Sequence, residues 1–567
     1  MPAIKKSSSH WYSETLKIWI SRFRFNGWMV AVFGIAFLAA LPVLVVLGSV
    51  FADTGEVWSH LASTVMPRYV ANSLWLMLGV SLGVSVIGVG TAWLVSLCRF
   101  PGRGLFEWGL LLPLAAPAYL LAYTYTDVLE YYGPIQTGLR SLFGWESATD
   151  YWFPNVRSVG GAIIMFSLTL YPYVYMLARV AFLEQSTRTL EASRSLGCGP
   201  WRSFFIIALP LARPSIMAGL SLALMETLND FGAVQFFGVS TFTTGIYRTW
   251  FGMGERVAAA QLAAMLMLFI LALILLEKWS RRQARYYQAG GRQQRSSAYQ
   301  LSGWRAQLAC LACMTPIGLG LLTPGGVLLN MTLRHWHQTV DSSFVTLASH
   351  SVLLATITAG VAMLAALILA YGARLQNSPM IRLGVRIASM GYATPGSVIA
   401  VGILIPVTRL DNAIASWAQT TFGLAPRLLF SGTITALVFA YLVRFLAVSL
   451  GTVESGLTKI RPSLDDAARS LGYGPTSTLM KIHAPLMGTS LLAAVMLVFV
   501  DVMKELPATL VMRPFNFDTL AVQVYQYASD ERLVEASAPA LMIVIVGLLP
   551  VILLSWRMTQ SRPSKAE

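Results

Sequence analysis

Charged side chains are scarce in this chain. Only 12% of its 567 residues are Asp, Glu, Lys or Arg, whereas 56% are hydrophobic. This balance excludes a soluble protein of several domains and is typical of an integral membrane protein. Cysteine is rare too, with four residues, and the lone Cys-x-x-Cys at Cys310 and Cys313 lies within an apolar run. We interpret this pair as small buried side chains and predict no metal or redox site there.

The chain contains no Gly-x-x-x-x-Gly-Lys-Ser/Thr stretch, the loop that cradles nucleotide phosphates in many ATPases. It also shows no paired His and Asp ligand cluster and no nucleophile motif, which disfavours a membrane enzyme. We therefore predict a non-catalytic chain that binds no cofactor of its own.

Long apolar runs, by contrast, fill most of the sequence. A helix needs about 20 mostly apolar residues to cross the ~30 Å hydrocarbon core of a bilayer. The sequence thus predicts an all-α integral membrane protein with about 12 transmembrane helices. Tyrosines between Tyr119 and Tyr132 fit an aromatic belt at the membrane interface. The apolar runs lie near residues 28–50, 73–97, 105–126, 160–182, 212–232, 257–277, 307–330, 351–372, 387–407, 430–450, 487–510 and 537–556.

The net charge of +15 reflects topology, because the basic residues are distributed over both tails and alternate loops. The remaining loops are poorer in basic residues and carry acids such as Asp53, Glu130 and Asp150. By the positive-inside rule, we place both termini of this multi-pass protein in the cytoplasm. The same distribution leaves no single basic face, so we predict membrane lipid and no nucleic acid as a partner.

Two polar segments, 275 positions apart, repeat one pattern. The first reads Glu-Ala-Ser-Arg-Ser-Leu-Gly-Cys-Gly-Pro from Glu191, and the second reads Asp-Ala-Ala-Arg-Ser-Leu-Gly-Tyr-Gly-Pro from Asp466. Each begins with a helix-compatible stretch, and its glycines and proline predict a corner before a second short helix. Two equivalent polar loops in an apolar protein, both predicted to be cytoplasmic, indicate two docking points for a soluble partner.

The similarity between the halves extends to the apolar runs. Ala116-Pro117 corresponds to Thr394-Pro395, and Glu226–Ala233 aligns with Asp501–Ala508. Because six spans is an even number, the two units have the same orientation and form a parallel repeat with a path between them. The predicted segments are a cytoplasmic tail (1–27), a first half (28–279), a cytoplasmic linker (280–305), a second half (306–557) and a tail (558–567).

The two polar loops, at about 185–213 and 459–488, resemble the EAA loop of permease subunits of bacterial binding-protein-dependent ABC importers. Two copies in one chain resemble the fused, double-length permeases. The strict Glu-Ala-Ala start is replaced by Glu-Ala-Ser at Glu191 and by Asp-Ala-Ala at Asp466. The resemblance implies that each loop forms a coupling helix that docks on an ATPase. The residues it assigns to this coupling are Glu191, Ala192, Gly197, Pro210, Asp466, Ala467, Gly472 and Pro485.

The same resemblance implies the fold of a type I ABC importer permease, located in the bacterial inner membrane. Two copies of a cytoplasmic ABC ATPase would use the ATP, and a soluble extracytoplasmic binding protein would deliver the substrate. Closure of the ATPase pair would rock the two halves between outward-open and inward-open states.

The second half looks most like ferric-iron permeases, so the resemblance implies Fe3+ as the substrate. The stretches Met503–Leu510, Arg513–Ala521 and Ala528–Arg532 carry this likeness. Thiamine and phosphonate permeases share the fused architecture and are alternatives. A secondary transporter with two six-span halves is an alternative of another class, although it would not need duplicated docking loops.

Four acidic residues occupy equivalent places in two apolar runs. Glu226 and Asp230 are four positions apart, as are Asp501 and Glu505, so each pair is predicted to share one helix face. Acids within a membrane usually line a polar path, and carboxylate oxygens suit a hard metal cation. We hypothesise that the four acids flank the translocation path, with Lys504 balancing part of their charge. Two alternatives are a position near the outer end of a helix, since Glu226 lies about two-thirds along its span, and a structural ion pair centred on Lys504.

Overall fold

The computed structural model describes residues 27–184, 197, 199–282, 299–376, 378–423 and 429–560. Within these residues, 10 helices are long and apolar enough to cross a membrane, and two bent helix pairs raise the number to 12 if each pair is one span. The prediction of an all-α membrane protein with about 12 spans is therefore confirmed.

The described elements of the first half run from α2 to α14. They are α2 (Gly27–Ser49), α3 (Glu56–Thr64), α4 (Met66–Leu97), β1 (Cys98–Arg99), α5 (Arg103–Gly109), η1 (Leu112–Ala115), α6 (Ala118–Leu129), α7 (Pro134–Phe143), α8 (Val159–Glu184), α10 (Pro200–Ser203), η2 (Phe204–Ala208), α11 (Leu209–Asn229), α12 (Gly232–Phe236), α13 (Phe242–Tyr247), η3 (Arg248–Gly252) and α14 (Arg256–Arg282).

The second half repeats this order, so that α18, α21, α25 and α28 correspond to α4, α8, α11 and α14. Its elements are β2 (Tyr299–Gln300), α15 (Trp304–Ile317), η4 (Gly318–Leu322), α16 (Thr323–Arg334), α17 (Trp336–Thr339), α18 (Ser342–Leu375), α19 (Pro379–Ala388), η5 (Ser389–Ala393), α20 (Gly396–Phe422), α21 (Ile434–Thr458), α22 (Pro462–Ser470), α23 (Pro475–Thr478), η6 (Leu479–His483), α24 (Ala484–Leu486), α25 (Gly488–Met503), α26 (Pro507–Met512), α27 (Leu520–Ser529) and α28 (Leu533–Gln560).

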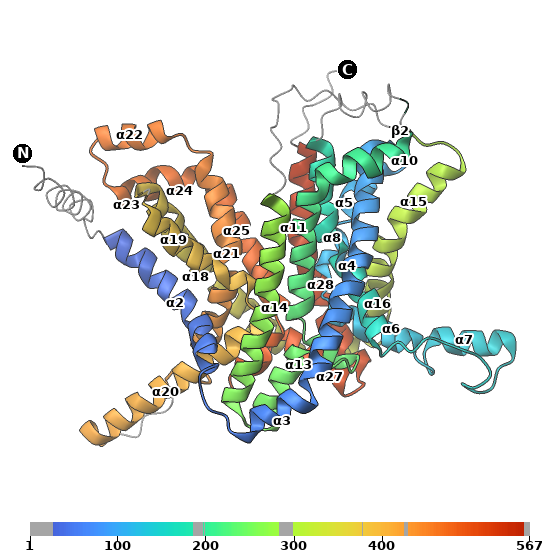
Figure 1. Cartoon of the computed structure of the whole chain (residues 1–567), viewed down its shortest axis with the longest axis horizontal. Helices are drawn as coiled ribbons and strands as arrows, with labels where there is room; N and C mark the ends of the chain where they lie inside the picture. The colour runs from blue at the N-terminus through green and yellow to red at the C-terminus, as the bar shows by residue number, and fades with distance from the viewer. Residues whose placement is uncertain are drawn as a thin grey trace, which may run out of the picture.

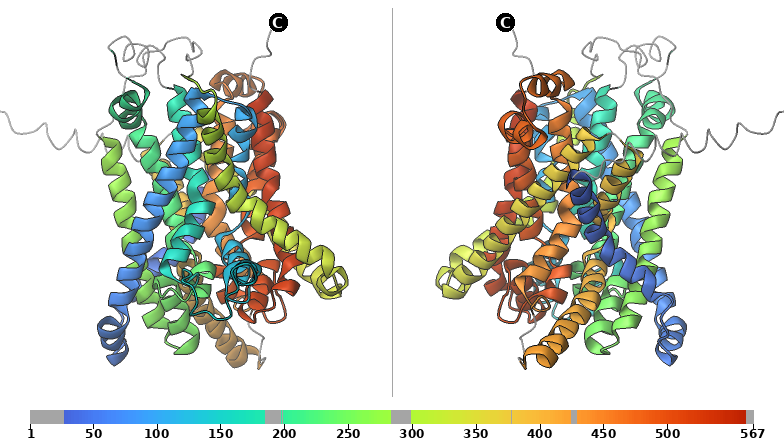
Figure 2. Two further views of the ribbon diagram at one scale, coloured as in Figure 1. Left: turned by 90° about the vertical axis from the view of Figure 1, so that its right-hand side faces the viewer. Right: turned by 90° about the vertical axis from the view of Figure 1, so that its left-hand side faces the viewer.

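The bundle has two distinct ends. Figure 1 shows α10 and α22 at one end, and α3, α7 and the far end of α20 toward the other. The rotated views in Figure 2 show the long helices running between these two ends from both sides. We call the end that carries α10 and α22 the α22 end, and the opposite one the α7 end. The described parts of the two repeated polar loops therefore lie at the same end of the molecule, as a parallel repeat requires.

The predicted span at 105–126 is not a single helix. The structure divides it into α5, η1 and α6, and the helical segments on either side of Ala116 and Pro117 differ in direction by 89°. Pro117 has no N–H to continue a hydrogen-bond ladder, and its ψ of 146° is extended. The bend directs α6 into the bundle, where Tyr119 is only 4% exposed.

The predicted span at 487–510 is broken as well. α25 ends at Met503, and α26 begins only at Pro507. The segment Pro475–Leu486 also turns by 81° into α25. Proline is favoured in the first turn of a helix and cannot extend a preceding one, so Pro507 starts a separate short helix. The residues between α25 and α26 are consequently non-helical and lie in the interior, where Glu505 is buried.

The first helix of each half packs against the other half. α2 lies against α18, α19 and α20, whereas α15 and α16 lie beside α4, α5 and α6 (Figure 1). Gly402 of α20 approaches Pro42 of α2 so closely that a Cβ would meet the Pro42 carbonyl oxygen. The hydroxyl of Tyr125 in α6 donates to the carbonyl of Leu319 in η4 at 2.6 Å. The two halves are therefore interlocked by an exchange of helices.

The described end of the linker is attached to the first half. Tyr299 and Gln300 form a two-residue parallel bridge with Cys98 and Arg99. The N–H of Leu301 extends it by donating to the Arg99 carbonyl at 3.0 Å. The last residues of the predicted linker therefore pair with the backbone that follows the end of α4.

Candidate translocation cavity and docking loops

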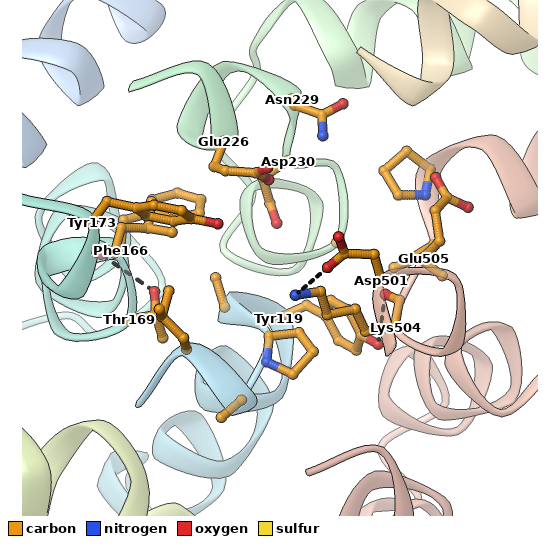
Figure 3. A pocket seen from close by; sticks show the side chains of 18 of the residues that line it. Tyr119, Phe166, Thr169, Tyr173, Glu226, Asn229, Asp230, Asp501, Lys504 and Glu505 are labelled. Carbon is orange, nitrogen blue, oxygen red and sulfur yellow. Dashed lines mark hydrogen bonds and ion pairs between the residues drawn. The ribbon is translucent and has the colours of Figure 1, made fainter. Parts of the chain in front are cut away.

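A cavity of about 120 Å³ lies between the two halves. Its walls come from η1, α6, α8 and α11 of the first half and from η5, α21, α25 and α26 of the second. Figure 3 shows acidic, basic and tyrosine side chains from both halves around this space. The structure brings together there all five residues that the sequence placed on the translocation path: Glu226, Asp230, Asp501, Lys504 and Glu505.

The predicted arrangement of the acids on helix faces is wrong. α11 ends at Asn229 and α25 ends two residues before Glu505, so neither pair of acids shares one helix. Asp230 instead has an extended backbone with a ψ of 140°. The helices stop because the carboxylates of Asp230 and Glu505 serve as caps for the next helices. In the second half, Pro507 also cannot extend α25.

Asp230 and Glu505 have the same structural role in the two halves. Asp230 Oδ1 accepts two backbone N–H groups at the start of α12, at 2.9 and 3.1 Å. Glu505 accepts the corresponding two N–H groups at the start of α26, at 2.9 and 3.0 Å. The first N–H groups of a helix have no partner within it, so a carboxylate there stabilises both its start and its dipole.

Basic side chains neutralise both acids of the second half. Lys504 Nζ lies 3.0 Å from Asp501 Oδ1, and Arg444 Nη1 lies 2.8 Å from Glu505 Oε1. Arg444 belongs to α21 and is only 9% exposed. The sequence analysis missed Arg444. An arginine inside a long apolar run is costly and usually functional or paired, and this signal could have identified it.

The first half has no base at the equivalent positions. Asn229 stands where Lys504 stands in the second half, and Thr169 stands where Arg444 stands. Among the residues that the structure describes, neither Glu226 nor Asp230 forms an ion pair. When all carboxylates are ionised, the excess negative charge of the cavity therefore lies on the first-half wall.

Tyrosine side chains contribute to the cavity wall. Tyr173 and Tyr392, which the sequence analysis did not single out, line it together with Tyr119. The interpretation of Tyr119 as part of an interfacial aromatic belt is wrong, because α6 begins inside the bundle after the bend at Pro117. Phenol groups add further hydrogen-bonding capacity to a wall that already carries carboxylates, two basic groups and apolar side chains.

Two hydrogen bonds join the halves at the cavity. Asn229 Oδ1 accepts the backbone N–H of Gly396 at 2.8 Å. The Tyr119 hydroxyl donates to the carbonyl of Lys504 at 3.5 Å. The repeat relates Asn229 to Lys504, and Gly396 to Ala118 beside Tyr119. The end of α11 in the first half thus contacts the first turn of α20, and the end of α25 in the second half contacts the first turn of α6.

The second polar loop consists of a helix, a corner and a second helix. α22 covers Pro462–Ser470, Gly472 has a positive φ of 79°, and α23 begins at Pro475. The Asp466 side chain is 74% exposed and lies 2.9 Å from the Arg469 guanidinium on the same face. Figure 1 shows α22 standing clear of the membrane helices. Its outer face is therefore accessible to a partner.

The first polar loop is described only in part, and Glu191 and Ala192 lie outside the described residues. Gly197 has a φ of 78°, almost the value at Gly472. Both corners thus use a left-handed backbone that glycine adopts without strain. The other predicted residues lie in α22 (Ala467) and in the first turns of α11 (Pro210) and α24 (Pro485).

Comparison with known proteins gives matches to transport permeases. The family described as "Binding-protein-dependent transport system inner membrane component" matches residues 18–286. The Fe(3+)-transport system permease protein FbpB 2 of Haemophilus influenzae is 26% identical over 498 residues, 86% of this chain and 90% of that protein. The ferric transport system permease protein FbpB of Actinobacillus pleuropneumoniae is 22% identical over 559 residues, 94% of this chain and 78% of that protein.

A shorter relative matches only part of the chain. The molybdenum transport system permease protein ModB of Escherichia coli (strain K12) is 29% identical over 204 residues, 35% of this chain but 86% of that protein. One such protein thus corresponds to one repeat unit, whereas the FbpB proteins correspond to both. Residues 18–286 thus match the binding-protein-dependent inner membrane component family, and relatives named as ferric permeases align with most of this chain, as a fused, double-length permease would.

Proposed function

We propose that this chain is the membrane subunit of an ATP-driven importer that carries ferric iron across the cytoplasmic membrane. Relatives named as ferric permeases span most of its length. The cavity between the halves holds four carboxylates and two basic groups, and this excess of carboxylate is the observation that supports a cationic substrate. Carboxylate and phenol oxygens are hard donors of the kind that Fe3+ prefers.

An anionic substrate fits this cavity less well. Sequence similarity to a molybdenum permease shows that related units serve other solutes, so identity alone does not select iron. An anion would be repelled by the unpaired acids on the first-half wall, Glu226 and Asp230. Thiamine is a cation too and is the second candidate, because the same charge excess would attract it.

In this proposal the α22 end of the bundle faces the cytoplasm, and two copies of an ABC ATPase dock there. The first loop would contact one copy through Glu191, Ala192 and Gly197, with Pro210 at the start of the following span. The second loop would contact the other copy through Asp466, Ala467 and Gly472, with Pro485 in the equivalent place. ATP would be used only by these partners, and this chain would bind no cofactor.

The transport cycle would follow from the repeat. An extracytoplasmic binding protein releases Fe3+ at the α7 end, and closure of the ATPase pair moves the two docking loops together. Because the halves are related by an axis along the membrane normal, their rotation opens the cavity to one side and then to the other. Glu226, Asp230, Asp501, Lys504 and Glu505 would line the path of the ion.

Uptake by reconstituted protein tests this function. Proteoliposomes containing the chain, its ATPase and MgATP would be given the binding protein loaded with radioactive Fe3+. We expect accumulation that requires ATP and the ATPase and is unchanged by a proton uncoupler. Uptake of thiamine in place of iron would identify the second candidate. Uptake without the ATPase, abolished by the uncoupler, would instead identify a secondary transporter.

A further inference from the structure

A polar cluster attaches α22 to the body of the second half. Asp465 Oδ2 accepts hydrogen bonds from Arg374 Nε at 2.9 Å and Nη2 at 2.6 Å. Its other carboxylate oxygen, Oδ1, lies 2.6 Å from His483 Nε2. Asp465 and Asp466 are adjacent, but their side chains are 24% and 74% exposed. One acid of α22 therefore faces the protein while the next faces outward.

Arg374 joins three helices at this point. It lies in the last turn of α18 and also donates to the carbonyl oxygens of Leu457 at 2.7 Å and Ile460 at 3.0 Å. The Leu457 carbonyl lies in the last turn of α21, where it also accepts the N–H of Ile460 at 3.2 Å, and the Ile460 carbonyl lies two residues beyond that helix. The planar guanidinium bonds them and Asp465 at the same time, which a lysine ammonium cannot reproduce. Arg374 thus fixes α22 relative to both α18 and α21.

His483 attaches the second part of the loop to the same carboxylate. Its ring is completely buried in η6, which continues through α24 to α25. Within the described residues its Nδ1 has no hydrogen-bond partner, so the bond to Asp465 is the polar contact that orients the ring. Nearby, the Tyr371 hydroxyl donates to the Pro475 carbonyl at 3.0 Å and holds the start of α23.

Two helices lead from this cluster to the cavity. α21 runs without a break from Ile434 to Thr458 and carries Arg444, the partner of Glu505. α25 carries Asp501 near its far end. α21 is thus continuous from the Arg374 contact to Arg444, whereas the path through His483 turns by 81° where α24 meets α25. Packed helices and ion-pair networks are the elements through which energetic coupling between sites is carried.

The first half does not encode the same cluster. The positions related by the repeat are occupied by other residue types, namely Ser96, Leu190 and Ala208. A different ionic set lies at the corresponding ends of α5 and α8, formed by Arg103, Glu107 and Arg179. The attachment of α22 by Arg374, Asp465 and His483 is therefore a property of the second half.

We propose that Arg374, Asp465 and His483 are positioning residues that transmit movement of α22 to the second-half wall of the cavity. The inference rests on the proposed function, because it takes α22 as a contact of the ATPase. It assigns different tasks to adjacent acids: Asp466 contacts the partner, and Asp465 transmits the motion inward.

The test measures coupling, defined as iron transported per ATP hydrolysed, in the reconstituted complex of chain, ATPase and loaded binding protein. Asp465→Asn and Arg374→Gln should each lower this ratio about tenfold while the ATPase still binds. The double variant should be no worse than either single one, because the two side chains act as one unit. Asp465→Glu keeps the carboxylate and should recover most of the coupling.

Asp466→Asn is the matched variant, since it makes the same change one position later on the outward face. It should weaken ATPase binding and leave the ratio of the bound complexes unchanged. An assembled Asp465→Asn complex with wild-type coupling would overturn the inference.

Assembly is checked by size-exclusion chromatography. Should Asp465→Asn fail to assemble, His483→Leu replaces it, because that change leaves the Arg374–Asp465 pair in place. A lowered ratio in His483→Leu then supports the inference, and a wild-type ratio contradicts it. If the wild-type complex shows no ATP-dependent iron uptake at all, the proposed function itself fails, and this outcome is distinct from any result with the variants.

Discussion

Asp230 and Glu505 lie 275 positions apart, and each caps a short helix that begins two residues later. Their hydrogen bonds to the backbone are nearly the same. Among the residues that the structure describes, however, only Glu505 has a basic partner, Arg444 at 2.8 Å. A repeated backbone thus supports two cavity walls of different charge, and this difference allows the role of each wall to be tested separately.

Removal of the unpaired acids should stop transport. In the variant Glu226→Gln/Asp230→Asn the excess negative charge of the cavity is lost, so we expect Fe3+ uptake to fall by about tenfold or more. The control, Asp501→Asn/Lys504→Met, removes an acid and its base together and leaves the excess charge unchanged. It should retain most uptake. The measurement is initial uptake in proteoliposomes with ATPase binding monitored in parallel, and equal losses in both variants would contradict a role for the charge excess.

A β-branched residue at either corner glycine should uncouple the transporter. Gly197 and Gly472 have φ values near +80°, where an L-residue with a branched side chain is strained by roughly 1–2 kcal/mol. Gly197→Val or Gly472→Val is therefore expected to reorient the loop and reduce iron transported per ATP. Gly474→Val is the control, since Gly474 has a φ of −73° and open space around its Cα. Wild-type coupling in both corner variants would refute the assignment of these loops.

An added methyl group at Gly396 should destabilise the junction of the halves. A Cβ there would meet the Arg444 guanidinium and lie 2.8 Å from Glu505 Oε1. We expect Gly396→Ala to lower stability by about 1–3 kcal/mol, because overpacking displaces a buried ion pair. Thermal unfolding in detergent would show a lower Tm. Gly360→Ala, in α18 with nothing within 4 Å of the new Cβ, should leave the Tm unchanged or raise it.

Arg444 should be needed mainly because Glu505 is present. Arg444→Met leaves a buried carboxylate without its base and is expected to cost about 3–5 kcal/mol of stability. Replacing both residues, as Arg444→Met/Glu505→Gln, should cost less than the single change, since no charge is then left unpaired. Unfolding of the purified variants measures both effects. A double variant less stable than Arg444→Met would show that the pair stabilises the chain by itself.

The sequence was sufficient for the parts of the structure that depend on local composition. Long apolar runs predicted about 12 spans, and the repeated corner glycines at Gly197 and Gly472 marked the turns of the two polar loops. Similarity between the halves gave the parallel repeat. These features follow from periodic burial and from backbone geometry, and both are encoded within short stretches.

Features that depend on distant contacts could not be predicted in the same way. Regular helical spacing suggested that Glu226 and Asp230 share a face, but the cap formed by Asp230 at α12 ends α11 first. Arg444 pairs with an acid 61 residues away, and no local pattern indicates that partner. Tyr119 was misplaced because the bend at Pro117 turns an apparent outer end of a span into the interior.

The exchange of first helices has a consequence for biosynthesis. α2 is made first, yet the helices that cover it, α18 to α20, are translated some 300 positions later. Until then α14 is the first-half helix that packs against α2, and much of the α2 surface faces lipid. Its composition suits this exposure, because its mean hydropathy is the highest among the 10 helices long enough to span a membrane in the described part of the chain. The first half therefore cannot complete its packing until the second half has been translated, so final assembly coincides with the end of synthesis.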